Sequence, residues 1–185
     1  MNQTYESIGM VELSSIAVGH EACDAMLKAA AVKMILARTI CSGKYIAMVT
    51  GDVAAVDASV RAGVDLGAET VVDWMVIPNV HPAVFPAMSA TVRIGMPDAL
   101  GIVESFSVAS LVEAADAAAK AAQIELIEIR LAMALGGKGF VTFTGPVDAV
   151  RAAVDAGAEP VERKGLLVRK VVIPAPRKEL MSDII

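Results

Sequence analysis

Hydrophobic and polar residues alternate along the first part of the chain in a pattern that predicts a strand followed by a helix. The apolar run 8–13 has the length of a strand, and Ser14 and Ser15 after it are typical of a helix start. Apolar and small residues then recur at helical spacing over 16–31, which predicts an amphipathic helix. The positions expected on its packing face are Ile16, His20, Cys23, Met26, Leu27 and Ala30.

The residues that follow predict a hairpin. Apolar runs over 32–40 and 44–49 are separated only by Cys41, Ser42 and Gly43, a spacing typical of two strands joined by a short loop. Serine or glycine would turn the chain as well as cysteine does. An oxidisable thiol at position 41 therefore needs an explanation beyond turn geometry.

A second helix and a fourth strand complete the pattern. Asp52, which ends the sequence Thr-Gly-Asp, is a cap signal for a helix over 53–66, where positions 53, 56, 60 and 64 are apolar and share one face. A further strand is predicted over 70–77 and is closed by Pro78. The order strand–helix–strand–strand–helix–strand is that of the ferredoxin-like split unit.

The second half of the chain repeats the first. When the sequence is shifted by 92 positions, about 14 of the 32 residues from Ser7 to Arg38 are identical to their counterparts. The offset grows to 94 where 43-GK-44 meets 137-GK-138, and to 96 where 77-IP-78 meets 173-IP-174. We therefore predict an α/β (α+β) protein of two tandem ferredoxin-like domains, with the first over residues 1–95 and the second over residues 96–185.

The composition favours extensive burial between proteins. Hydrophobic residues make up 56% of the chain and the mean hydropathy is +0.61, which suits either a membrane span or a large interface. The long charge-free run from Trp74 to Val92 contains three prolines, so a membrane span is not expected. The N-terminal residues lack the basic and apolar regions of a signal peptide. We expect no membrane partner.

Charge and cysteine content narrow the possibilities further. The net charge of −5 and the isoelectric point near 5.0 argue against nucleic acid as a partner. Two cysteines form no disulfide framework, which fits the reducing cytoplasm. A cytoplasmic location is therefore expected.

The repeated motifs resemble a known domain. The segments 9-GMVEL-13, 20-HEACDAMLKAA-30 and 43-GKYIAMVTGDVAAV-56 resemble the bacterial microcompartment (BMC) shell domain, and 101-GIVES-105 and 137-GKGFVTFTGPVDAV-150 resemble it again. The resemblance covers nearly the whole chain and is closest to the tandem-domain class of propanediol-utilisation microcompartments. It implies a pseudohexameric homotrimer that mimics the six-fold tile of single-domain shell proteins. Ethanolamine and glycyl-radical compartments use similar tiles, so the enclosed pathway is not specified.

The resemblance also implies a role for Cys41. Members with a similar Thr-Ile-Cys-x-Gly-Lys turn place its cysteine at the pore, where it binds an iron–sulfur cluster. A three-fold ring brings one turn per chain to a common axis, so three Cys41 thiolates, one from each of three subunits, would ligate a [4Fe–4S] cluster. Backbone N–H groups of Ser42 and Gly43 would hydrogen-bond its sulfides. On the residues alone, a buried packing cysteine and a zinc site both stay open.

The second copy of this turn has diverged. It reads 131-LAMALGGKG-139, which is about two residues longer and contains no cysteine. A trimer would carry three turns of each kind around the axis. We expect the longer turn, with Gly136 and Gly137, to fold back and leave room on the axis, because glycine tolerates the left-handed geometry of such a detour.

Two residues on the first predicted helix are expected to serve packing. Cys23 is matched by Ala115 in the second copy, and His20 is matched by Val112. A ligand that one copy replaces with an apolar residue is better explained as a buried or interface side chain.

The resemblance implies edge roles for a further set of residues. Lys28 and Lys120 match the lysine that family members place at tile edges, where it contacts other shell proteins. His81 matches a histidine of the family's Ile-Pro-Arg-Pro-His segment, whereas Asn79 replaces the arginine of that segment. Solvated lysines on a helix surface are the plain alternative.

The predicted function is structural and not enzymatic. The chain has two histidines and no credible Ser-His-Asp set, and 135-LGGKG-139 lacks the spacing of a phosphate-binding loop. We expect a shell tile whose cluster passes electrons across the shell to an encapsulated or cytosolic redox enzyme. A metal-free gated metabolite pore is the first alternative. The second is a small-molecule sensor or enzyme, because the ferredoxin-like fold supports many functions.

Overall fold

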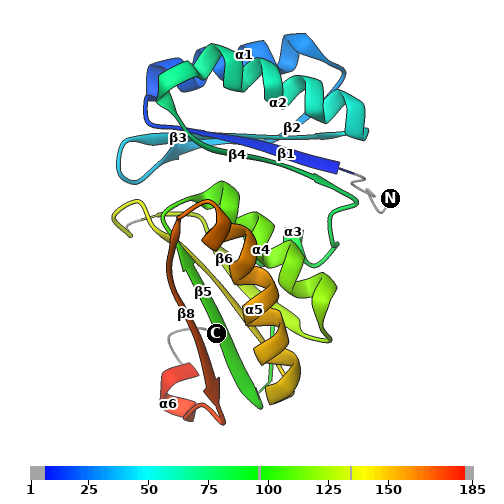
Figure 1. Ribbon diagram of the computed structural model, residues 1–185, viewed down its shortest axis with the longest axis vertical. Helices are drawn as coiled ribbons and strands as arrows, with labels where there is room; N and C mark the ends of the chain where they lie inside the picture. The colour runs from blue at the N-terminus through cyan, green and yellow to red at the C-terminus, as the bar shows by residue number, and fades with distance from the viewer. Residues whose placement is uncertain (1–6, 96, 134, 182–185) are drawn as a thin grey trace. The chain divides into compact units, whose positions relative to one another are not determined.

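A computed structural model of the chain describes residues 7–95, 97–133 and 135–181 (Figure 1). The chain divides into two compact units. The first contains the described residues up to Val80 together with those of Ala132–Gly137, and the second contains His81–Leu131 and the residues from Lys138 onwards. A short segment of the second sequence repeat therefore belongs structurally to the first unit.

The first unit is a four-stranded antiparallel sheet covered on one face by two helices (Figure 1). Its elements are β1 (Ser7–Leu13), α1 (Ile16–Ala29), β2 (Lys33–Ile40), β3 (Lys44–Gly51), α2 (Val53–Gly67), a 3₁₀ turn (Ala68–Thr70) and β4 (Val71–Pro78). The strand order is β2-β3-β1-β4, so β1 lies between β3 and β4. This is the predicted ferredoxin-like order.

The second unit has the same architecture. Its elements are α3 (Val84–Met88), β5 (Ala99–Ser105), α4 (Val108–Ala121), β6 (Glu125–Arg130), β7 (Gly139–Gly145), α5 (Val147–Arg163), β8 (Leu167–Pro174) and α6 (Lys178–Met181). The strand order β6-β7-β5-β8 matches that of the first unit, and α4 and α5 cover one face of the sheet (Figure 1). The predicted fold class, two tandem units of four strands and two main helices, is confirmed.

Side-chain caps begin the helices where the sequence predicts them. The Ser15 side chain accepts a hydrogen bond from the Val18 N–H at 3.4 Å, and Asp52 accepts one from the Ala55 N–H at 2.8 Å. Ser107 caps α4 in the same way. Helix α5 differs because it starts at Pro146, which offers no side-chain acceptor.

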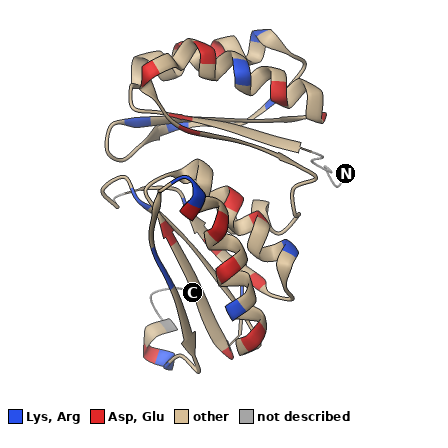
Figure 2. Cartoon of the chain, in the orientation of Figure 1, with Lys and Arg blue, Asp and Glu red and all other residues tan. Residues whose placement is uncertain are grey.

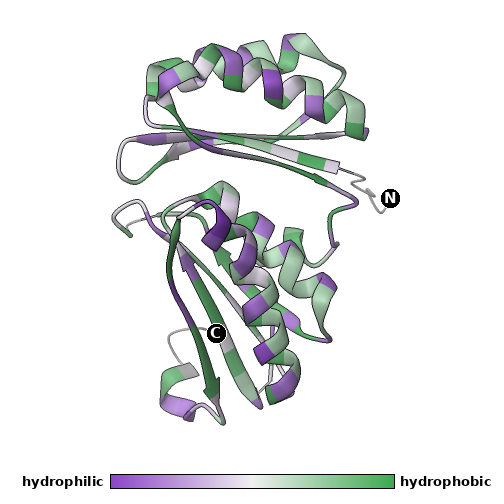
Figure 3. Cartoon of the chain, in the orientation of Figure 1, coloured by the Kyte–Doolittle hydropathy of each residue, from purple (hydrophilic) through white to green (hydrophobic). Residues whose placement is uncertain are grey.

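The packing face of α1 differs from the predicted one. Its buried residues are Gly19, Ala22 and Met26, whereas Ile16 and Leu27 are 41% and 44% exposed. Gly19 explains the shift, because a Cβ atom there would lie 2.5 Å from Cγ of the Tyr45 ring on β3. The small residues therefore face the sheet. Figure 3 shows hydrophobic and hydrophilic residues interleaved along the visible sides of α1 and α2.

The domain boundary predicted between residues 95 and 96 stays a prediction, and Met96 lies outside the described residues. None of the helices in the described part of the chain has the length and apolar character needed to cross a bilayer. Charged residues of both signs occur on the helices of both units (Figure 2).

Candidate site at the Cys41 turn

The Cys41 turn joins β2 to β3 in the first unit. Ile40 pairs with Lys44 at the end of the hairpin, which confirms the predicted short loop. Gly43 has φ of 76°, and no atom lies within 4 Å of the position that a Cβ would take there. Glycine suits this position because the left-handed region is strained for other residues. Ser42 and Gly43 are exposed, and Cys41 is half-buried and not part of a disulfide.

A second backbone segment supports this turn. The Cys41 N–H donates a hydrogen bond to the Ala132 carbonyl at 3.0 Å. Gly137 also lies close to the cysteine turn. A Cβ atom built on it would lie 3.5 Å from the Cys41 carbonyl oxygen and 3.5 Å from the Ser42 nitrogen. Both residues come from the diverged turn of the second repeat, which was expected to detour. The diverged turn packs against the cysteine turn of the first repeat, a contact that the sequence did not predict. That it leaves room on a trimer axis stays a prediction.

A buried ion pair lies beside the turn. The Lys44 Nζ lies 2.5 Å from Glu12 Oε1, and the two side chains are 11% and 0% exposed. The same Nζ donates a hydrogen bond to the Gly137 carbonyl at 3.0 Å. Lys44 therefore connects the central strand β1, the hairpin and the segment from the second repeat.

The second repeat has a weaker version of this pair. Lys138 Nζ lies 2.6 Å from Glu104 Oε1, but the two side chains are 39% and 28% exposed. Water screens an exposed pair more strongly than a buried one. The two repeats thus share the ion pair and differ in how deeply they bury it.

Cys23 has the packing role that its replacement by Ala115 predicted. It lies partly buried against the hydrophobic core of the first unit, which includes Tyr45. Burial raises the pKa of the Cys23 thiol, and the adjacent Asp24 carboxylate raises it further. His20 is exposed, with its Nδ1 atom 3.5 Å from the Tyr45 hydroxyl.

Two stretches of the chain, residues 7–80 and 99–176, match the BMC domain family. The chain belongs to the BMC-domain family of bacterial microcompartment shell proteins. Its two copies of the domain are the two sequence repeats. The family predicted from the motifs is therefore confirmed.

Relatives of this BMC-domain chain are similar along its whole length. It is 41% identical to the bacterial microcompartment shell protein PduT of Citrobacter freundii, over 97% of this chain and 98% of that protein. A crystal structure of a microcompartment protein from Desulfitobacterium hafniense is 52% identical, with a TM-score of 0.82 over 95% of this chain and 98% of that one. The fused permuted hexameric shell protein MSM0275 of the RMM microcompartment is 22% identical with a TM-score of 0.65, over 84% and 81% of the two chains, and shares the fold.

The predicted edge residues of the BMC domains lie in two different environments. Lys28 Nζ lies 2.5 Å from Asp24 Oδ2 on α1, and the two side chains are 75% and 62% exposed. On α4, Lys120 pairs with Asp116 at 2.6 Å, and that carboxylate is only 9% exposed. The other oxygen of Asp116 accepts a hydrogen bond from the backbone N–H of His81 at 2.7 Å. Contacts of either lysine with other tiles stay a prediction.

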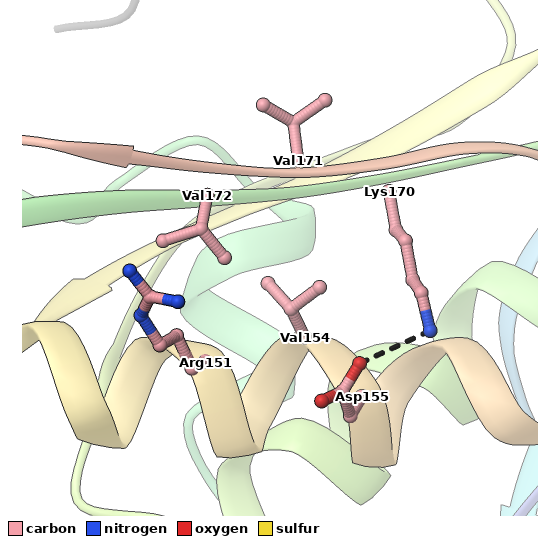
Figure 4. A pocket seen from close by; sticks show the side chains of 6 residues that line it. All are labelled: Arg151, Val154, Asp155, Lys170, Val171 and Val172. Atoms are coloured by element: carbon pink, nitrogen blue, oxygen red, sulfur yellow. Dashed lines mark hydrogen bonds and ion pairs between the residues drawn. The ribbon is translucent and has the colours of Figure 1, made fainter.

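The second BMC domain also carries a groove of about 260 Å³ between α5 and β8 (Figure 4). Its lining residues are Arg151, Val154, Asp155, Lys170, Val171 and Val172. Hydrogen bonds to Asp155 and to Glu162 raise the pKa of Lys170, at distances of 3.0 and 3.2 Å. The lysine charge is thus already balanced by two carboxylates. None of the predicted site residues lines this groove.

Proposed function

We propose that the chain forms a trimeric tile of a microcompartment shell, in which three Cys41 thiolates hold an iron–sulfur cluster at the central pore. The observation that supports this most directly is that two hydrogen bonds hold the turn against residues 132–137. The Cys41 N–H donates to the Ala132 carbonyl, and Lys44 Nζ donates to the Gly137 carbonyl. A turn held on two sides presents its thiol in a constant position. Ligand groups need such preorganisation.

Exposed apolar side chains support a trimer. Large hydrophobic residues that are more than two-fifths exposed in the single chain include Ile16, Leu27, Val53, Leu66, Trp74 and Phe106. Exposed apolar surface on this scale is typical of a protein that buries it against partners. Three chains with two BMC domains each supply the six domains of a hexagonal tile, and a closed ring is the common solution for identical subunits.

The donor set fits an iron–sulfur cluster. Each chain brings one thiolate at this turn, and a three-fold ring would bring three. Thiolates are the usual ligands of iron in such clusters, and backbone N–H groups near the sulfur atoms tune the potential. Cys41 would ligate the cluster, and the backbone N–H groups of the exposed residues Ser42 and Gly43 would hydrogen-bond it. When bound, the cluster supplies one-electron transfer across the shell, and a redox enzyme on either side would be its partner.

The proposal is tested by anaerobic purification of the wild type and of Cys41→Ser. We expect a coloured wild-type trimer with about four irons for every three chains and an electron paramagnetic resonance signal after reduction. Cys41→Ser should be a colourless trimer. Cys23→Ala is the matched control, because it removes the other thiol from a packing position, and it should keep its iron. A wild-type trimer without iron would contradict the cluster and leave a gated metabolite pore. Zinc instead of iron in the wild-type trimer would indicate a tetrahedral zinc site at the Cys41 turn.

A further inference from the structure

The chain leaves β4 and β8 with the same unusual backbone geometry. Asn79 follows Pro78 with φ of 52°, and Ala175 follows Pro174 with φ of 45°. Non-glycine residues rarely adopt left-handed angles, so their occurrence at equivalent positions of the two repeats is a shared structural feature. Each is followed by a buried residue, Val80 in one case and Pro176 in the other. The two exit segments therefore share this feature of backbone geometry and burial.

His81 follows β4 in the sequence, belongs to the second unit and is hydrogen-bonded to Asp116 of the same unit. The backbone N–H of His81 donates to Oδ1 of Asp116 at 2.7 Å, and Lys120 donates to Oδ2 at 2.6 Å. Both oxygens of Asp116 are therefore used, and its side chain is 9% exposed. This contact is made where the chain itself passes from the first repeat to the second.

Helix α1 carries the same acid–lysine pair one repeat earlier. Asp24 and Lys28 correspond to Asp116 and Lys120 at the offset of 92. Lys28 binds Asp24 Oδ2 in the same way, but the Asp24 side chain is 62% exposed. Among the described residues, none donates a backbone N–H to Asp24.

We infer that the exit segment 175–178 of one chain docks on the Asp24–Lys28 pair of the next chain in the trimer. The backbone N–H of Arg177 would donate to Asp24 Oδ1 of that neighbour, as the N–H of His81 donates to Asp116. In the proposed ring the first domain of the next chain follows the second domain of this one, so the helix that corresponds to α4 for this exit segment is α1 of another copy. The inference rests on the proposed trimer and specifies how its ring closes. Such head-to-tail contacts are what generate a closed three-fold ring.

The charges of the two surfaces support docking of segment 175–178 on α1. The exit segment carries Arg177 and Lys178, both exposed, and α1 presents Glu21 and Asp24 as exposed acids. Opposite charges across an interface favour the correct pairing. Such a contact would also leave Lys28 accessible to other tiles. In the equivalent pair of the second repeat, the Lys120 side chain is 41% exposed although Asp116 is only 9% exposed. An edge role of Lys28 between tiles is thus compatible with an Asp24 contact inside a tile.

Cross-linking tests the inference directly. Asp24→Cys and Arg177→Cys are combined in a chain that also carries Cys23→Ala and Cys41→Ser, and the trimer is treated with a short bifunctional thiol reagent. We expect chains to be joined to one another in ladders up to three. The matched control is His81→Cys with Asp116→Cys in the same background, which places the same pair within one chain and should leave the mass of a single chain.

Association provides a second measurement that does not require a cross-link. Asp24→Ala should weaken the trimer about tenfold per interface, the usual effect of losing one hydrogen bond to a charged group. Asp57→Ala removes another exposed i,i+4 pair, with Arg61 on α2, and should leave association unchanged. A stable trimer without cross-links between chains, or with full affinity after Asp24→Ala, would overturn the docking contact but leave the tile. A wild-type monomer would overturn both.

Discussion

Lys44 and Glu12 form a buried ion pair in the first unit, and the Gly137 carbonyl accepts a hydrogen bond from the same ammonium group. The pair connects β1 and β3 to a segment that comes 93 residues later in the chain. A buried charge is stable only when it is paired and hydrogen-bonded. Both requirements are met here by residues from the two different repeats.

Lys44→Met should destabilise the first unit by about 3 kcal/mol, because it removes the ion-pair partner of the buried Glu12 carboxylate. The loss should appear as a lower denaturant midpoint. Lys138→Met is the matched control, because it breaks the equivalent pair at a more exposed place, and it should cost less than about 1 kcal/mol. Equal effects of the two substitutions would contradict the role of burial. In the anaerobic preparation, Lys44→Met should also lower the iron content.

Gly19→Ala should destabilise the chain by about 1–3 kcal/mol through overpacking. The added methyl group would lie 2.5 Å from the Tyr45 ring, so α1 would have to move away from the sheet. Gly95→Ala has no atom within 4 Å of its new Cβ and provides the control. Thermal unfolding of the two variants checks this prediction. If Gly19→Ala melts at the wild-type temperature, α1 can move away from Tyr45 without loss of stability and the prediction is wrong.

The stability of the first unit should fall as the pH rises above about 9. Burial raises the pKa of the Cys23 thiol above its ordinary value of 9.0, and burial also raises the pKa of Tyr45. The folded state then holds protons that the unfolded state has already released, so stability is complete below the ordinary pKa and is lost as the pH rises through the raised one.

Cys23→Ala should flatten this pH dependence, because it removes one of the two groups. Urea unfolding at pH 7 and pH 10 measures the difference. Cys41→Ser serves as the control thiol variant. If Cys23→Ala and the wild type lose the same stability between the two pH values, the thiol is not the group responsible.

Removal of iron from the proposed cluster should leave the fold intact. The hydrophobic core of the first unit, built around residues such as Leu13, Met26 and Val60, does not include the Cys41 turn. A chelator under reducing conditions should therefore bleach the protein without changing its circular dichroism or its sedimentation as a trimer. Unfolding on chelation would instead indicate a structural metal.

Element order, the duplication and the helix caps could be predicted because each has a local signal. Hydrophobic period and a capping serine or aspartate identify an element wherever it occurs, as at Ser15 and Asp52. The packing face of α1 could not be predicted in this way. Hydrophobic spacing marks Ile16 and Leu27 as apolar but does not say whether the burial occurs within the chain or against a partner.

The support of the Cys41 turn by the second repeat had no sequence signal either. Its acceptors are the carbonyls of Ala132 and Gly137, and every residue carries a carbonyl. The insertion of about two residues was visible as a change of offset, and it correctly marked the turn as different. Where the longer turn packs depends on tertiary structure.

The membership of residues 132–137 in the first unit makes the two repeats unequal. A polypeptide cut between the repeats would separate the cysteine hairpin from residues 132–137, which support it. The second repeat would retain all four strands of its own sheet. The first repeat therefore cannot be returned to an independent single-domain subunit without rebuilding its hairpin. Engineered tiles in which the second repeat is exchanged should therefore keep residues 132–137 of the original chain together with the first repeat.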